Sequence, residues 1–63
     1  MTKQEAIKAC KKSAKKAWHT MYVVYDVSYA EKYGKNDAYA LASLYDLDTF
    51  YLGEKPIYAA EPD

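Results

Sequence analysis

The chain has 63 residues, of which 51% are hydrophobic and 29% are charged, with nine lysines, no arginine and nine acids. A chain this short buries only about 60% of the surface that its unfolded form exposes, which excludes two-domain enzymes, nucleotide-binding βαβ folds and barrels. Its eight tyrosines argue against disorder, because disordered chains are poor in aromatic residues. We therefore expect one small folded domain over residues 1–63, and the composition does not name its function.

The zero net charge hides an asymmetry between the two parts of the chain. Residues 1–18 contain six lysines and one acid, a net charge of +5, whereas residues 19–63 contain three lysines and eight acids, a net charge of −5. One interpretation is that the two parts attract each other within one fold. The other is that one part steers a partner of opposite charge.

The single cysteine, Cys10, cannot form an intramolecular disulfide, which favours a reducing compartment. No apolar run approaches the ~20 residues that span a bilayer, and the N-terminus lacks the continuous apolar stretch of a signal peptide. We expect a cytoplasmic protein that is not inserted in a membrane.

The first segment predicts an amphipathic helix. Thr2 and Glu5 form the pattern of a capping box, so the helix should begin near Lys3. Apolar residues recur at helical spacing opposite the lysines: Ile7, Cys10, Ala14, Ala17 or Trp18, and Met21. We expect this stripe to pack on the protein's own sheet.

Residues 19–29 are dense in β-branched and aromatic side chains and predict a strand. Alternation along this strand would turn four side chains toward the core, namely Met21, Val23, Tyr25 and Val27. Residues 34–37 predict a turn, because glycine supplies positive φ and Asn and Asp bond their own backbone. A second strand over residues 38–43 would complete a hairpin.

Residues 38–52 also fit an alternative in which Asp37 caps one helix and Gly53 ends it. We prefer a strand followed by a short helical turn over residues 46–52, since the first strand needs a partner. Pro56 and Pro62 bound a last strand, which suits an edge position. The expected fold class is α+β, with an N-terminal amphipathic helix packed on a small three-stranded antiparallel sheet and a short helical turn before the last strand.

The sequence contains no convincing catalytic, metal or cofactor motif. Asp46 and Asp48 resemble the paired aspartates of haloacid-dehalogenase-type phosphotransferases, but Phe50 stands where that motif has Thr or Val, and the calcium-loop spacing also fails. One of these aspartates should instead cap the helical turn. Cys10 and His19 would project to opposite sides of a helix, and two distant glycines cannot form a phosphate loop. We expect no enzyme activity, no metal and no cofactor.

The tyrosines carry the main functional hypothesis. A core this small cannot bury eight phenols with satisfied hydroxyls, so several should be exposed. Exposed tyrosine interleaved with acids is typical of protein-binding surfaces. The expected partner-binding residues are Tyr22, Tyr45, Asp46, Asp48, Phe50 and Tyr51.

Two alternatives to this hypothesis remain open. The lysine face of the first helix could bind nucleic acid or another anion through Lys8, Lys11, Lys12, Lys15 and Lys16. Against it, the chain has no arginine and the remaining part carries a charge of −5. A structural homo-oligomer, in which the basic helix of one copy meets the acidic surface of another, is the second alternative.

The run Tyr45-Asp46-Leu47-Asp48-Thr49-Phe50-Tyr51, the ending Ile57-Tyr58-Ala59-Ala60-Glu61-Pro62-Asp63 and the lysine-alanine opening helix resemble small uncharacterised proteins encoded by bacteriophages. This resemblance implies no activity and no site. It implies a small accessory or inhibitor protein that acts on a host or phage macromolecule, which agrees with the protein-binding hypothesis.

Overall fold

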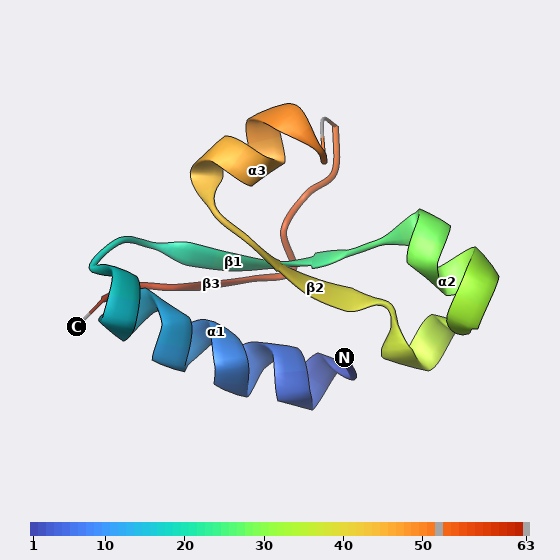
Figure 1. Cartoon of the computed structure of the whole chain (residues 1–63), viewed down its shortest axis with the longest axis horizontal. Helices are drawn as coiled ribbons and strands as arrows, with labels where there is room; N and C mark the ends of the chain where they lie inside the picture. Colours follow the sequence, from blue (N-terminus) through green and yellow to red (C-terminus); the bar gives the residue numbers. More distant parts are fainter. Residues whose placement is uncertain (52, 63) are drawn as a thin grey trace.

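The computed structural model describes residues 1–51 and 53–62. Its elements in chain order are α1 (Lys3–Ala17), β1 (Met21–Tyr25), α2 (Val27–Tyr33), the short 3₁₀ helix η1 (Lys35–Asp37), β2 (Tyr39–Ala42), α3 (Leu44–Thr49) and β3 (Tyr58–Ala60). The three strands form an antiparallel sheet in the order β2-β1-β3, with β1 in the centre. The predicted α+β fold class is confirmed (Figure 1).

Helix α1 begins where the capping box predicts. The Thr2 hydroxyl accepts a hydrogen bond from the Glu5 amide at 3.3 Å, and the Glu5 carboxylate accepts one from the Thr2 amide at 2.9 Å. Small residues on one face let the helix approach the sheet closely: Ala6, Cys10 and Ala14 are fully buried against Val23 and Ala60. The predicted packing of this helix on the sheet is confirmed.

The predicted place of Ala17 or Trp18 on the buried stripe is wrong, because both residues are exposed. Helix α1 ends at Ala17, and Trp18 follows it as a left-handed cap with φ of 60° and its amide bonded to the Ala14 carbonyl at 2.9 Å. Its side chain is 79% exposed. The left-handed backbone of Trp18 ends the helix before the indole can join the buried stripe.

The predicted strand over residues 19–29 is too long. Strand β1 ends at Tyr25 because Asp26 caps a new helix, accepting a hydrogen bond from the Tyr29 amide at 3.0 Å. Val27 therefore lies on α2 and is exposed instead of facing the core. Helix α2 buries none of its residues and projects beyond the hairpin that β1 and β2 form (Figure 1).

The alternative of one helix over residues 38–52 is wrong, and the preferred strand and helical turn are confirmed with shifted bounds. Strand β2 pairs Ala40 with Val24 and Ala42 with Tyr22. Helix α3 begins two residues earlier than predicted, and its predicted end at residue 52 lies outside the described residues. Strand β3 is shorter than the predicted 56–62, and it occupies an edge as expected.

Both faces of the sheet are covered. Helix α1 lies on the face that includes Val23, whereas α3 and the segment after it lie on the opposite face (Figure 1). That second face buries Val24 and Ala42 completely. Alternation along β1 correctly separates Val23 from Val24, but the expectation of a single core face is wrong because the chain crosses back over the sheet between β2 and β3.

Candidate functional site

A reciprocal set of hydrogen bonds caps the start of α3. The Ser43 hydroxyl accepts from the Asp46 amide at 3.2 Å, while Asp46 Oδ2 accepts from the Ser43 amide and hydroxyl, each at 3.0 Å. The cap of this helix is therefore Ser43, and the prediction that Asp46 or Asp48 is the cap residue is wrong. Asp46 is the third residue of the capping box, half-buried and engaged, while Asp48 is exposed.

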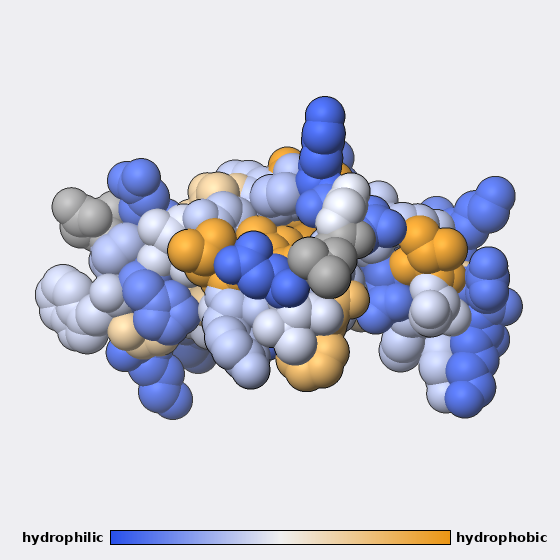
Figure 2. Space-filling model, turned by 90° about the horizontal axis from the view of Figure 1, so that it is seen from above, coloured by the Kyte–Doolittle hydropathy of each residue, from blue (hydrophilic) through white to orange (hydrophobic). Residues whose placement is uncertain are grey.

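Helix α3 and Phe50, which follows it, present large apolar side chains to solvent. Leu44 is 62% exposed, and Tyr45 and Phe50 are each 72% exposed. Figure 2, viewed from the α3 side, shows apolar residues gathered over this part of the molecule between hydrophilic side chains. Leu44 is a residue that the sequence-based site omitted. The sequence signal that could have placed Leu44 at the start of this helix is its position directly after Ser43, a residue type that favours helix N-caps.

One groove beside α3 brings together Tyr22 from β1 and Tyr45 from α3. His19, Thr20, Ser43 and Leu44 complete its walls. The two tyrosines are more than twenty positions apart in the chain, and they meet because α3 folds back over the sheet beside the start of β1. We call this groove the α3 surface and define it by three of its lining residues, Tyr22, Leu44 and Tyr45.

A second groove lies between the start of α2 and the segment that follows α3. It has a volume of about 410 Å³ and is lined by Tyr25, Asp26, Val27, Ser28, Phe50, Tyr51 and Glu54. We call it the α2 groove. Phe50 and Tyr51 were expected as site residues. Tyr25, Asp26 and Glu54 were not expected. Tyr25 and Asp26 come opposite Phe50 and Tyr51 only through the return of the chain after α3, whereas Glu54 follows Tyr51 in the same segment.

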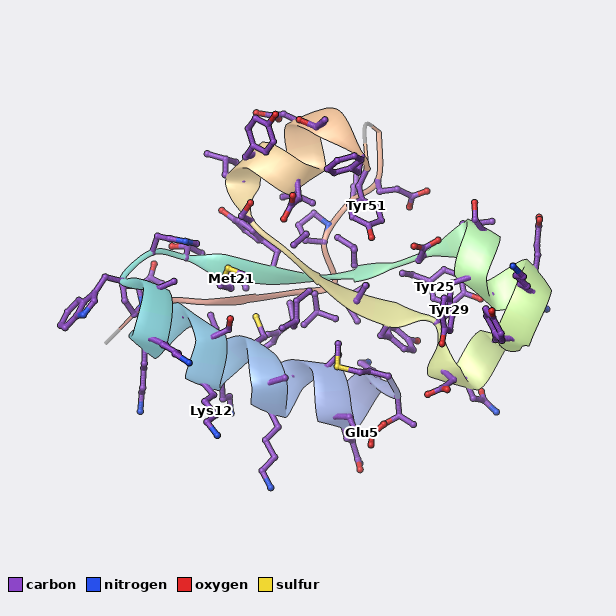
Figure 3. The ribbon with its side chains drawn as sticks, in the orientation of Figure 1. Glu5, Lys12, Met21, Tyr25, Tyr29 and Tyr51 are labelled. Atoms are coloured by element: carbon purple, nitrogen blue, oxygen red, sulfur yellow. The ribbon has the colours of Figure 1, made fainter. Side chains whose placement is uncertain are left out.

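A hydrogen bond crosses the α2 groove. The Tyr51 hydroxyl donates to Asp26 Oδ2 at 3.4 Å, and the other carboxylate oxygen of Asp26 caps α2. In Figure 3 Tyr51 descends from the segment after α3 on the side where α2 begins. Burial raises the pKa of Tyr51, and the negative charges of Asp26 and Asp46 raise it further. The phenol therefore stays protonated and donates.

The lysines of α1 lie apart from both grooves. Lys8, Lys11, Lys12, Lys15 and Lys16 are all exposed, and Figure 3 shows Lys12 pointing away from the sheet. Within the part of the chain that the structure describes, these lysines form no ion pair, because the single pair joins the N-terminal ammonium to Asp37 at 3.4 Å. Among the described residues, therefore, no acid neutralises these lysines through an ion pair.

The two remaining candidate residues, Cys10 and His19, lie in surroundings that fit structural roles. Cys10 is fully buried on the face of α1 that packs on the sheet, and burial raises the pKa of its thiol. The exposed His19 ring lies 3.1 Å from the Thr20 carbonyl oxygen. In residues 1–51 and 53–62, no group of three His, Cys, Asp or Glu side chains is arranged to hold a metal ion. Within the same residues, no helix is long and apolar enough to cross a bilayer.

Comparison with known proteins gives no further assignment. No protein-family model matches the chain, and neither curated proteins nor solved structures give a match. The function of the site therefore has to follow from its geometry. This geometry consists of a three-stranded sheet that is covered on both faces and of two grooves lined by aromatic residues near α3.

Proposed function

We propose that this protein is a small non-enzymatic binding module that recognises another protein through the α3 surface. The observation that carries the proposal is the exposure of Leu44 and Tyr45 on a helix that is too short to be stable alone. Such large side chains cost free energy in water, about 25 cal/mol per Å² of apolar surface. A partner that covers them recovers this free energy, and aromatic side chains dominate binding energies at protein interfaces.

The charge around α3 defines the chemistry of the partner. Between Ser43 and Glu54 every charged residue is an acid, namely Asp46, Asp48 and Glu54. Asp48 and Glu54 are exposed, and Glu54 lines a groove together with Phe50 and Tyr51. A partner with apolar side chains at its centre and Lys or Arg at its rim complements this arrangement. A small accessory or inhibitory protein in a reducing cytoplasm, the role implied by the resemblance to phage proteins, fits this proposal.

The test is a comparison of exposed tyrosines on two different helices. Tyr45→Ala removes the most exposed aromatic ring of the α3 surface, whereas Tyr33→Ala removes a ring that is 60% exposed on α2, away from that surface. Both variants and the wild-type protein serve as bait in a nuclease-treated bacterial lysate. The proposal predicts a protein that the wild type and Tyr33→Ala retain and that Tyr45→Ala loses. Equal retention by all three baits refutes it.

The lysine face of α1 supports a second candidate function, nucleic-acid binding. Five exposed lysines without described ion pairs provide a positive surface, and phosphate contacts of this kind release counterions. The candidate predicts that affinity for a 20-nucleotide single strand falls steeply with salt and that Lys12→Gln combined with Lys16→Gln weakens it. Binding that is indifferent to both changes refutes it.

A further inference from the structure

The α2 groove combines aromatic rings with negative charge. Tyr25, Phe50 and Tyr51 line it from β1 and from the segment after α3, while Asp26 and Glu54 are the charged side chains among the described residues that line it. Aromatic rings attract cations through their negative faces, and nearby carboxylates add to this attraction. The groove therefore favours a positively charged group that is flat or carries apolar atoms.

The two carboxylates differ in their freedom to meet a ligand. Asp26 already accepts hydrogen bonds from the Tyr29 amide and the Tyr51 hydroxyl, so its role is to hold the tyrosine ring in place and to contribute negative charge. Glu54 is exposed, and its backbone amide donates to the Tyr51 carbonyl at 3.0 Å, which fixes the residue at the rim. The Glu54 carboxylate is the group that can move onto an incoming cation.

We propose that the α2 groove receives a guanidinium side chain of the partner protein, with the cation between Phe50 and Tyr51 and its charge met by Glu54. A guanidinium suits this site because it is planar, weakly hydrated and able to stack on an aromatic face while it bonds a carboxylate through two donors. Burial is the main cause of the raised pKa of Tyr51, and the negative charge of Asp26 adds to it. This inference rests on the proposed function, because it names one contact of the partner that α3 recognises.

The experiment titrates the ¹⁵N-labelled protein with N-acetyl-arginine amide, and with the neutral citrulline analogue as a matched ligand. The arginine probe should shift the amide signals of Asp26, Phe50 and Glu54 in a saturable manner, while the citrulline probe should not. Glu54→Gln should weaken the arginine probe about two- to five-fold, as expected for an exposed charge pair. Phe50→Ala should weaken it by a similar factor through the lost ring.

Two controls separate this proposal from the proposed function. Glu31→Gln removes the same charge from the exposed face of α2 outside the groove and should leave the affinity for the probe unchanged. Tyr45→Ala should also leave it unchanged, although it abolishes capture of the partner. Equal shifts with arginine and citrulline, or equal weakening by Glu54→Gln and Glu31→Gln, overturn the guanidinium site and leave the α3 surface to be judged by its own test.

Discussion

Removing the hydroxyl of Ser43 should destabilise α3 without unfolding the protein. Helix α3 has six residues and buries none of them completely, and isolated helices of this length are not stable in water. Its capping box is therefore the main local support. In Ser43→Ala the Asp46 amide loses its acceptor at 3.2 Å and Asp46 Oδ2 loses the hydroxyl donor at 3.0 Å. Loss of such a cap costs about 0.5–2 kcal/mol.

The lost capping free energy should appear as faster hydrogen exchange of individual amides in α3. The Leu47 and Phe50 amides donate to the Ser43 and Asp46 carbonyls within α3, at 3.0 Å and 2.8 Å. Their protection should fall roughly two- to thirty-fold in Ser43→Ala, which corresponds to the lost capping free energy. Protection in the middle of α1, at Cys10, should not change, because the α1 face of the core does not include α3.

A matched serine provides the control. Ser28→Ala makes the same chemical change on the short helix α2, where Asp26 and not Ser28 is the cap, so it should leave exchange in α3 unchanged. Loss of protection at Cys10 equal to that at Leu47 would refute the reasoning, since α3 would then unfold only together with the core. Unchanged protection at Leu47 would show that tertiary contacts alone hold the helix.

Three further predictions concern α1. Trp18→Gly should raise the free energy of unfolding in urea by up to about 1 kcal/mol, because glycine adopts the observed φ of 60° without strain and the indole is largely exposed; a loss of stability would contradict this. Hydrogen bonds from Thr2, first from its backbone amide and then from its hydroxyl, lower the pKa of Glu5 below its ordinary value of 4.5. The stabilisation from Glu5 should therefore be present above pH 4.5 and be lost as the pH falls through the lower folded-state pKa, and Glu5→Gln should abolish this pH dependence of urea unfolding. Buried Cys10, whose thiol pKa is raised by burial, should react with a thiol reagent roughly 100-fold or more slowly than in the urea-unfolded chain; equal rates would show that α1 detaches readily.

Several parts of the fold could be predicted from short stretches of the sequence. The Thr2 and Glu5 pair places the start of α1, and the spacing of Cys10 and Ala14 identifies its buried face. These features depend on contacts within one or two helical turns. Strand β1 and its pairing with β2 also follow from the apolar run and the turn residues after it, because a strong strand needs a neighbouring strand.

Only the tertiary structure decided where the chain crosses the sheet. The end of β1 at Tyr25 depends on Asp26, whose two carboxylate oxygens bond one local amide and the distant hydroxyl of Tyr51. Strand propensity alone extends the strand through Tyr29, since it takes account of neither the Asp26 cap nor a side chain 25 positions away. The same return of the chain buries Val24 and brings Phe50 opposite Tyr25. Exposure of aromatic residues was predictable from their number, but their division between two grooves required the long-range packing of α3 over the sheet.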